Sequence, residues 1–323
     1  MDLTICIPCF NDAKNVDKLL KSIYKSDTEG LEFEVLVCDG KSDDDIKKVV
    51  LSWESKIPVR LISTSYGASA SVNLNVGAAC AKGVIFCRID SHCLVTSHFI
   101  KSGLREFTSR SKDFAALGPS VEVIASNDGP ISKTISKLYM SPFLFGPSKY
   151  KRSVFYERYS GEVGNIYLGF YLTEDVERLR FSENIKRKQD IEFLSRLKAE
   201  KGIGFYNSSE VVIKYILKQD GLFPLMGRCF RQGQLLSESI SSSRLVHCLP
   251  LIFAILYLVL IIADMLYVPT LGIYLALSFI FGALECRTVF GALFALILFP
   301  CVHLSYVGGN IVGIIQRIIV SKR

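Results

Sequence analysis

Short apolar runs alternate with helical patterns along the first 90 residues of the chain. The runs are short, largely apolar and rich in β-branched residues, which is typical of strands buried in a parallel sheet. They are Leu3–Pro8, Phe33–Cys38, Val59–Ser63 and Val84–Ile89. Because no run is longer than six residues, we predict strands here rather than buried helices.

The stretches between these runs carry the pattern of helices. In the first stretch, apolar residues fall on one helix face and lysines on the other. The apolar residues are Val16, Leu19, Leu20, Ile23 and Tyr24. The second helix should begin at Ser42–Asp45, where hydroxyl and acidic residues suit an N-terminus, and the third covers Gly67–Cys80 and ends at Gly83. This alternation predicts an α/β fold with right-handed βαβ units.

The C-terminal part differs from the rest in its charge. Between Leu245 and Gln316 the only charged residues are Asp264, Glu285 and Arg287. They separate three uncharged runs, which are Leu245–Ala263, Met265–Leu284 and Thr288–Gln316. A helix needs about 20 apolar residues to cross the hydrocarbon core, so we predict a membrane anchor of two to three spans over residues 244–323. An amphipathic connector, residues 216–243, should join it to a domain formed by residues 1–215.

The distribution of positive charge predicts the side of the membrane. Lys218, Arg228, Arg231 and Arg244 lie just before the first apolar run, where positive residues favour the cytoplasmic side and anionic lipid headgroups. The N-terminal apolar run is too short for a signal peptide. We therefore expect a multi-pass protein of the cytoplasmic (inner) membrane, with the N-terminal domain in the cytoplasm.

The third apolar run contains residues that interrupt helices. Pro300 and the Gly308–Gly309 pair predict a break within it. If the first two runs form a hairpin, a third full span would place the basic C-terminal residues outside, against the positive-inside rule. We therefore expect the last segment to dip into the membrane and return, with Asp264 at the interface.

The bulk composition narrows the functions to consider. The net charge of +7 is modest, and no basic stripe interleaved with aromatic residues appears, so a nucleic-acid partner is not expected. The chain has ten cysteines, which in a cytoplasmic protein are best explained as reduced thiols.

Polar residues follow three of the four predicted strands at the point where each ends. They are Asn11 and Asp12, then Asp39, then Asp90 with His92. Turn formation explains each one alone, but the carboxyl ends of parallel strands form one edge of the sheet, where ligands bind. Acids gathered there repel one another unless a cation joins them, so the pattern indicates a divalent metal that carries a diphosphate. Neither GxxxxGK[ST] nor GxGxxG follows the first strand, which excludes a P-loop NTPase and a Rossmann dehydrogenase.

Several segments resemble a known enzyme family. IPCFND, VLVCDGKSDDD and GASASVNLNVGAACAKGVIFCRIDSH resemble, in order and spacing, the family 2 inverting glycosyltransferases of GT-A fold. SPFLFGPSKYKR, IYLGF, RKQDIEF and HLSYVGG resemble the bacterial subgroup typified by the succinoglycan-biosynthesis enzyme ExoA. The resemblance implies a Rossmann-like mixed sheet that binds a nucleotide sugar, followed by C-terminal transmembrane helices.

The resemblance assigns donor-binding residues to the first two strand ends. Pro8, Asn11 and Asp12 match the first-strand motif, whose acid contacts the base or ribose of the nucleotide. Asp39 matches the acid that binds the uracil or ribose side, and Ser42 belongs to the same turn.

Asp90-Ser91-His92 matches the DxD element of the family, in the form that ends in histidine. The match implies that Asp90 contacts the ribose or the metal and that His92 is a metal ligand. Imidazole is a reasonable ligand for Mg²⁺ or Mn²⁺, although hard cations prefer oxygen. A solvent-exposed turn histidine is the alternative.

Gln189-Asp190 falls where the family has its ED-type motif, so the resemblance makes Asp190 the catalytic base. A carboxylate at a helix N-terminus is stabilised in its charged form and can take the proton of an acceptor hydroxyl. A simple N-cap is the alternative. Gln189 replaces the usual acid, which leaves open the role of a second carboxylate.

Arg228–Gln232 occupies the place of the QxxRW sequence of processive relatives, without its glutamine and tryptophan. Arg231 retains a guanidinium that can balance the charge of a leaving diphosphate. The altered sequence favours a single addition over polymerisation.

The sequence thus predicts a metal-dependent hexosyltransferase of surface polysaccharide (exopolysaccharide) biosynthesis. The expected donor is UDP-hexose, and the expected acceptor is a polyprenyl-diphosphate-linked sugar or another glycan. Two alternatives remain. Gln189 and Gly164, which replace acids common in the subgroup, allow a non-catalytic membrane scaffold of the same fold, and the metal pattern also suits a nucleotidyltransferase.

Overall fold

The computed structural model of the chain describes residues 1–146, 158–185, 189–218, 221–236, 249–263 and 266–321. The chain forms two compact units. The first holds Met1–Glu122 and the described part of Tyr156–Ile216, and the second holds the described parts of Val123–Ser148 and Leu217–Arg323. Arg244 and Asp264, which the topology prediction used, lie outside the described residues.

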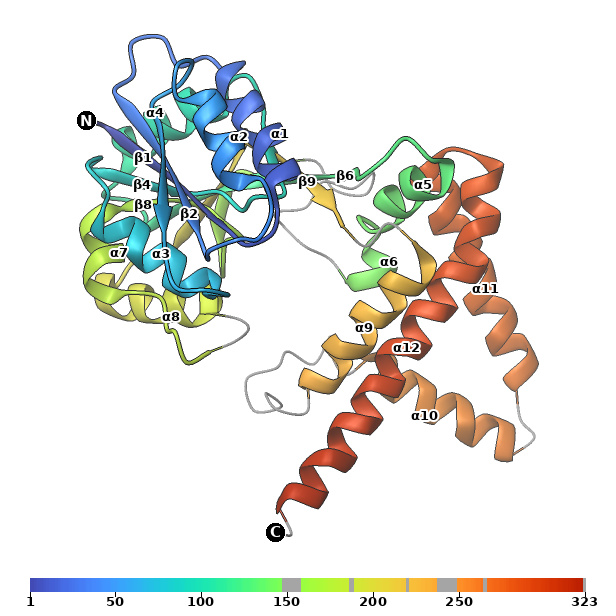
Figure 1. The fold of residues 1–323 in the computed structure, drawn as a ribbon. Helices are drawn as coiled ribbons and strands as arrows, with labels where there is room; N and C mark the ends of the chain where they lie inside the picture. The colour runs from blue at the N-terminus through green and yellow to red at the C-terminus, as the bar shows by residue number, and fades with distance from the viewer. Residues whose placement is uncertain (147–157, 186–188, 219–220, 237–248, 264–265, 322–323) are drawn as a thin grey trace. The chain divides into compact units, whose positions relative to one another are not determined.

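The four predicted strands form the parallel half of one sheet in the first unit. They are β1 (Leu3–Cys9), β2 (Phe33–Asp39), β3 (Val59–Ser63) and β4 (Ile85–Arg88), in the spatial order β3-β2-β1-β4 (Figure 1). The register aligns Cys9 of β1 with Asp39 of β2 and Cys6 with Arg88 of β4. The carboxyl ends of these strands therefore lie at one edge of the sheet, as the sequence predicts.

The sheet continues beyond β4 with antiparallel strands, which makes it mixed. The full order is β3-β2-β1-β4-β8-β6-β9-β5, and β7 pairs with β9. The added strands are β5 (Cys93–Val95), β6 (Ala116–Ala125), β7 (Gly161–Val163), β8 (Gly169–Leu172) and β9 (Phe205–Leu217). This arrangement confirms the predicted mixed sheet of GT-A type.

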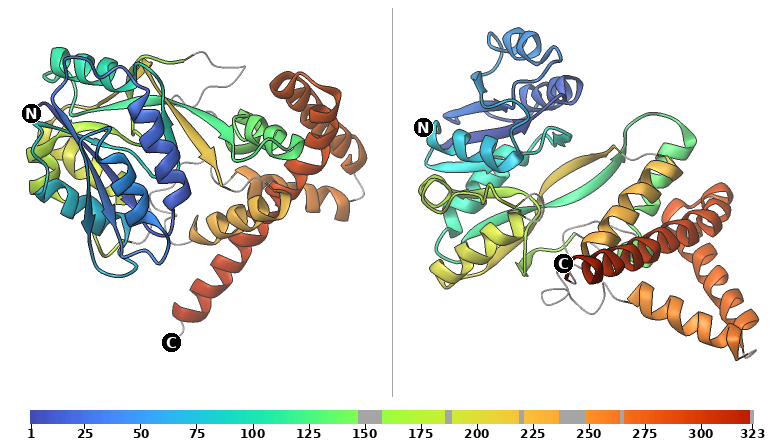
Figure 2. Two further views of the ribbon diagram at one scale, coloured as in Figure 1. Left: turned by 45° about the horizontal axis from the view of Figure 1, so that its top comes forward. Right: turned by 60° about the horizontal axis from the view of Figure 1, so that its bottom comes forward.

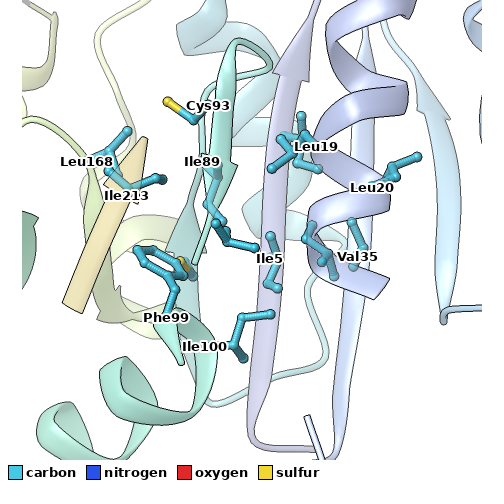
Figure 3. Packing of buried hydrophobic residues seen from close by; sticks show 14 of the residues in the cluster. Ile5, Leu19, Leu20, Val35, Ile89, Cys93, Phe99, Ile100, Leu168 and Ile213 are labelled. Carbon is cyan, nitrogen blue, oxygen red and sulfur yellow. The ribbon is translucent and has the colours of Figure 1, made fainter. Parts of the chain in front are cut away.

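Helices cover both faces of the sheet. Their bounds are α1 (Ala13–Tyr24), α2 (Ile46–Trp53), α3 (Ala70–Ala79), α4 (Phe99–Arg110), α7 (Thr173–Leu179) and α8 (Gln189–Lys201). Helices α1, α2 and α4 share one buried cluster with the sheet, and α3, α7 and α8 share the other. Figure 3 shows Leu19 and Leu20 of α1 beside Ile5 of β1 and Val35 of β2 in the first cluster. Apolar burial of this kind contributes about 25 cal/mol per Å² and holds the strand ends in place.

Two buried cysteines have the spacing of a CxxC motif but do not form a pair. Cys6 and Cys9 both lie in β1, and residues three apart in a strand point to opposite faces. Cys6 packs in the cluster with α3, and Cys9 packs in the cluster with α1. The motif therefore supplies packing here and no metal or redox site.

The second unit is helical. It contains α5 (Pro130–Leu138), α6 (Pro142–Phe145), α9 (Leu222–Leu236), α10 (Leu249–Ile262), α11 (Tyr267–Cys286) and α12 (Val289–Ser321). Helix α9 lies along α12 in all three views of Figures 1 and 2, and α11 also packs on α12. Phe143 of α6 stacks on Phe281 of α11, with 5.0 Å between the ring centroids, so α6 packs among these helices.

Glycines allow α9 and α12 to approach closely. A Cβ on Gly309 would lie 2.0 Å from the carbonyl oxygen of Phe230, and one on Gly233 would lie 2.1 Å from that of Tyr306. Small residues at helix interfaces permit such backbone contact, which is common between membrane helices. The part of the chain predicted to connect domain and anchor is thus, over α9, packed against the last helix.

The predicted break in the third apolar run is wrong. Helix α12 is continuous from Val289 to Ser321, with Pro300 inside it. The glycines at 308 and 309 do not end the helix, because they serve the contact with α9 instead. A long apolar helix tolerates proline where neighbouring helices compensate for the missing hydrogen bond.

Two helices in the described part of the chain, α11 and residues 289–319 of α12, are long and apolar enough to cross a membrane. The first predicted run gives only α10, whose 14 residues span about 21 Å at 1.5 Å per residue. That length is short of the roughly 30 Å hydrocarbon core. Length and composition thus allow two C-terminal spans.

Candidate active site

The ends of β1 and β2 are joined by hydrogen bonds between three of the predicted donor-binding residues. The backbone N–H of Asn11 donates to Ser42 Oγ at 2.7 Å, and the Ser42 hydroxyl donates to Asp39 Oδ1 at 2.5 Å. The Ser42 N–H also donates to Asp39 Oδ2 at 3.1 Å. Asn11, Ser42 and Asp39 therefore form one connected group at the edge of the sheet.

The local backbone explains why these residue types stand here. Asn11 and Lys41 both have positive φ, at 50° and 55°, a region that asparagine tolerates better than most residues. The Asn11 side chain then accepts a hydrogen bond from the N–H of Asp43 at 2.8 Å. Asp44 accepts from the N–H of Ala13 at 2.8 Å and so satisfies the start of α1 from the neighbouring turn.

Buried polar residues of α3 and of the end of β3 support this edge of the sheet. Asn73 of α3 donates to the carbonyl oxygen of Cys9 at 3.1 Å and accepts from the hydroxyl of Thr64 at 2.6 Å. The Thr64 N–H donates to the carbonyl oxygen of Asp39 at 2.8 Å. The ends of β1, β2 and β3 are thus fixed to one another through α3.

Asp12 connects the first strand end to the fourth. The hydroxyl of Ser91 donates to Asp12 Oδ2 at 2.5 Å, and Asn15 donates to Asp12 Oδ1 at 2.7 Å. Ser91 is the middle residue of the predicted DxD-like element. The structure therefore brings Asp12 together with Asp90-Ser91-His92, which lie 78 to 80 positions later in the sequence.

Asp90 is buried and held by two side chains. Arg88 Nε donates to its Oδ1 at 3.0 Å, and the Tyr167 hydroxyl donates to its Oδ2 at 3.0 Å. Burial raises the pKa of Asp90, but the charges of Arg88 and His92 and these two hydrogen bonds outweigh it, so the net pKa lies below its ordinary value. Asp90 is therefore a carboxylate at neutral pH.

His92 is half-buried beside Asp90. Its ring packs edge-on against Tyr215 with 4.9 Å between centroids, and its carbonyl oxygen accepts from the N–H of Ile216 at 2.9 Å. In the part of the chain that the structure describes, no group of three or more His, Cys, Asp or Glu side chains has the geometry of a metal site. Asp90 and His92 fit Mg²⁺ or Mn²⁺ by donor type, as a carboxylate and an imidazole, if the ligand's phosphates supply the remaining oxygens.

Asp190 lies in the first turn of α8, where the sequence places it, and it is half-buried. Burial lowers the pKa of the Arg88 guanidinium, but Asp90 and then Asp190 raise it by their negative charge, and the net pKa is above its ordinary value. Asp190 also contributes to raising the pKa of the buried Tyr171, chiefly an effect of burial. The negative charge of Asp190 therefore acts on two buried groups, Arg88 of β4 and Tyr171 of β8.

The remaining two predicted residues have different positions. Pro8 is buried in β1 opposite Cys38, beyond the last residue of β1 that pairs with β4. Its missing N–H therefore falls where β1 has left that neighbour. Arg231 is exposed on α9, in the second unit.

Two residues of this site were not predicted from the sequence. Arg88 falls within the predicted strand Val84–Ile89, and Tyr167 within the segment IYLGF. An arginine within the apolar run VIFCRI is nevertheless a signal, because a charge inside a buried strand needs a partner. The partner of Tyr167 could not be inferred, since its contact with Asp90 joins residues 77 positions apart.

Sequence comparison with known proteins identifies the same glycosyltransferase family that the sequence motifs resemble. The model of glycosyl transferase family 2 matches residues 4–165, half of the chain. A Methanococcus voltae protein, dolichyl N-acetyl-alpha-D-glucosaminyl phosphate 3-beta-D-2,3-diacetamido-2,3-dideoxy-beta-D-glucuronosyltransferase, is 26% identical over 220 residues, 66% of each chain. Glycosyltransferase AglE of Haloferax volcanii is 23% identical over 130 residues, 39% of this chain and 41% of its own length. The matches thus span 66% and 41% of the lengths of these relatives.

Solved structures show the same fold. Mannosyltransferase PcManGT from Pyrobaculum calidifontis, in complex with GDP-Man and Mn²⁺, has a TM-score of 0.57 at 17% identity, over 99% of this chain and 88% of that one. TarS 1–349 of S. aureus, in complex with UDP-GlcNAc, has a TM-score of 0.51 at 15% identity, over 96% and 90%. The family match, the mixed sheet and its polar edge agree, and the chain belongs to glycosyl transferase family 2 with a GT-A fold.

Proposed function

We propose that the chain is an inverting, metal-dependent hexosyltransferase that uses a nucleotide sugar, most simply a UDP-hexose, as its donor. One observation carries this proposal. Hydrogen bonds join Asp39 through Ser42 to Asn11, and Asp12 to Ser91, while Arg88 bonds to Asp90 just beyond the end of β4. A nucleotide, its phosphates and a sugar need contacts along such a continuous edge.

The ends of β1 and β2 form the nucleoside part of this proposed site. Asp39 and Asp12 offer carboxylate oxygens, which accept hydrogen bonds from ribose hydroxyls or base N–H groups. The turn around Ser42 sets the direction of Asp39, because it donates twice to that carboxylate. Pro8 and Asn11 shape the backbone on which the nucleoside would rest.

Asp90 and His92 form the phosphate part. They would hold Mg²⁺ or Mn²⁺, which neutralises the charge that develops on the leaving diphosphate. Arg88 and Tyr167 keep the Asp90 carboxylate ionised and fixed for this purpose. Arg231 lies in the second unit, and its contribution to the diphosphate stays a prediction from the resemblance to QxxRW-containing relatives.

Asp190 acts as the base in this mechanism. It takes the proton of the acceptor hydroxyl while that oxygen bonds to C1 of the sugar. The bond between C1 and the phosphate oxygen breaks, and its electron pair remains with the diphosphate. Attack from the opposite face inverts the anomeric carbon. Asp190 lies in the first turn of α8, where a negative side chain interacts favourably with the helix dipole.

The apolar helices α11 and α12 suggest where the acceptor comes from. We propose that they attach the protein to the cytoplasmic (inner) membrane as a multi-pass anchor, with the first unit in the cytoplasm. The acceptor would then be a polyprenyl-diphosphate-linked sugar or a nascent surface glycan, as in the ExoA-like branch of exopolysaccharide synthesis. The name of the Methanococcus relative, which acts on a dolichyl phosphate sugar, supports this choice.

Transfer assays with a matched pair of variants test the proposal. Asp190→Asn removes the base and should lower kcat about 1,000-fold, while the affinity for UDP with Mn²⁺ stays within about threefold. Glu192→Gln alters an acid in the same helical turn that pairs with Arg196 instead, and it should keep nearly full activity. Release of UDP supports a glycosyltransferase, whereas release of pyrophosphate, or full activity in Asp190→Asn, contradicts the proposal.

A further inference from the structure

Arg88 is a buried cation for which no role was predicted from the sequence. Its side chain is 6% exposed and comes from β4, two residues before Asp90. The guanidinium lies over the ring of Phe181, 5.9 Å from its centroid. Phe181 in turn is fixed by Asn75 of α3, whose amide donates to the Phe181 carbonyl at 2.9 Å and accepts from its N–H at 2.7 Å.

The hydrogen bonds of this guanidinium are incomplete. Arginine has five N–H donors, and Nε uses one on Asp90. Nη1 is buried, yet among the described residues it has no hydrogen-bond partner. A buried charged donor left unpaired is unfavourable, because it has lost its hydrogen bonds to water and gained none in the protein. Such an atom points to a partner that arrives in another state of the site.

Besides Asp90, the acid whose charge acts on Arg88 is Asp190. It is half-buried at the start of α8, and its charge acts on Arg88 together with that of Asp90. Asn75, which holds Phe181 below the guanidinium, also donates to Glu183 at 2.8 Å on the segment that leads to α8. Asn75 thus holds both Phe181, whose ring lies beside the Arg88 guanidinium, and the segment that leads to Asp190.

We infer that Arg88 is a positioning residue that joins Asp90 to Asp190, with Nε on the first carboxylate and Nη1 reserved for the second. This inference rests on the proposed function, because it needs Asp190 to be the base. Arg88 would then set the distance between the donor's phosphate side and the base. A movement of one carboxylate would then move the other. The acceptor hydroxyl would therefore attack C1 in line with the bond that breaks.

Three variants of the full-length protein test this role. Arg88→Met keeps an unbranched apolar side chain and removes every N–H donor of the guanidinium, and it should lower kcat about 100-fold, an effect that a 1 Å misplacement can have. Arg88→Lys restores the charge and should recover about tenfold of that loss. Tyr167→Phe removes the other hydrogen bond to Asp90 without touching Asp190 and should lower kcat by less than about tenfold.

Kd for UDP with Mn²⁺ and the melting temperature are measured for each variant. A large fall in kcat for Arg88→Met, with Kd and melting temperature close to those of Tyr167→Phe, supports the inference. Equal losses of kcat in Arg88→Met and Tyr167→Phe overturn it, because Arg88 would then act only through Asp90. A fall in melting temperature that Lys does not restore also overturns it.

Should Arg88→Met fail to fold, the comparison of Arg88→Lys with Tyr167→Phe decides in its place. A greater loss of kcat in Arg88→Lys at equal Kd supports the inference, and equal losses overturn it. The outcome is separate from that of the proposed function. Full activity in Asp190→Asn contradicts both the proposed function and this inference. An inactive Asp190→Asn, together with equal losses of kcat in the Arg88 and Tyr167 variants, contradicts this inference alone.

Discussion

The two units of the chain treat polar groups in opposite ways. In the first, polar side chains gather at one edge of a sheet and bond to one another, as Asp39, Ser42 and Asn11 do. In the second, apolar side chains such as Ile262 and Val289 are 77% and 75% exposed, and helices meet through glycines. The first unit is built to bind a polar ligand, and the second to rest in an apolar environment.

The two units also differ in how far the sequence predicts them. Local rules suffice for the parallel half of the sheet in the first unit, because strand length, helix periodicity and polar strand ends repeat at short range. The second depends on contacts between distant segments. Residues 123–148 belong with the C-terminal helices, and Lys137 of α5 donates to the carbonyl oxygen of Cys286 at 3.4 Å. No pattern of hydropathy shows that pairing.

The largest expected effect tests the close contact of α9 with α12. In Gly309→Val, the new Cβ would lie 2.0 Å from the carbonyl oxygen of Phe230, and backbone on both sides leaves it no room. We expect the second unit to lose about 3 kcal/mol, the upper range for overpacking. Thermal unfolding is measured in detergent with two probes. Circular dichroism reports on all helices, and the fluorescence of the only tryptophan, Trp53 of α2, reports on the first unit.

The adjacent glycine provides the control. A Cβ on Gly308 would lie 3.6 Å from the Phe230 ring, an ordinary contact, so Gly308→Ala should leave the circular dichroism transition nearly unchanged. In Gly309→Val the fluorescence transition of Trp53 should stay in place. If both transitions fall together, the units do not unfold separately, and the contrast between them is weaker than the structure indicates.

A smaller effect is expected when the polar edge is altered instead. Asp39→Asn keeps the shape of the side chain but removes its charge and one of the oxygens that accept from Ser42. Hydrogen bonds to charged groups contribute about 1.5–3 kcal/mol, so the affinity for UDP with Mn²⁺ should fall about 30-fold. Isothermal titration calorimetry measures it. Asp45→Asn, at an exposed acid that pairs with Lys48 close by, should bind as the wild type does, and equal losses would assign the effect to net charge alone.

The candidate site was predictable only as far as its residues follow strands. Asp12, Asp39 and Asp90 could be found because a parallel sheet brings strand ends together. Arg88 and Tyr167 could not, since their importance comes from the direction of side chains within the fold. The continuous α12 was missed for a similar reason. Gly309 breaks an isolated helix but in the folded chain makes room for Phe230.

The smallest effect concerns the other end of the sheet, where a buried acid has no part in binding. Glu34 of β2 accepts from the Lys82 N–H at 2.7 Å, the Thr4 hydroxyl at 2.9 Å and Arg60 at 3.0 Å. Burial raises the pKa of Glu34, but these bonds outweigh it and the net pKa is lowered. Its stabilisation is therefore complete above the unfolded-state pKa of about 4.3 and is lost as pH falls through the folded-state pKa.

Glu34→Gln should lower the free energy of unfolding of the first unit by about 1 kcal/mol at pH 7, since the charge-assisted bonds weaken while Arg60 stays partly solvated. Denaturant titrations followed by Trp53 fluorescence should show this difference shrink towards pH 3, as the wild-type Glu34 also becomes protonated. Glu32→Gln, at a side chain that is 78% exposed, should show no difference at either pH. A gap between Glu34→Gln and wild type that persists at pH 3 would mean that shape, not charge, secures this end of the sheet.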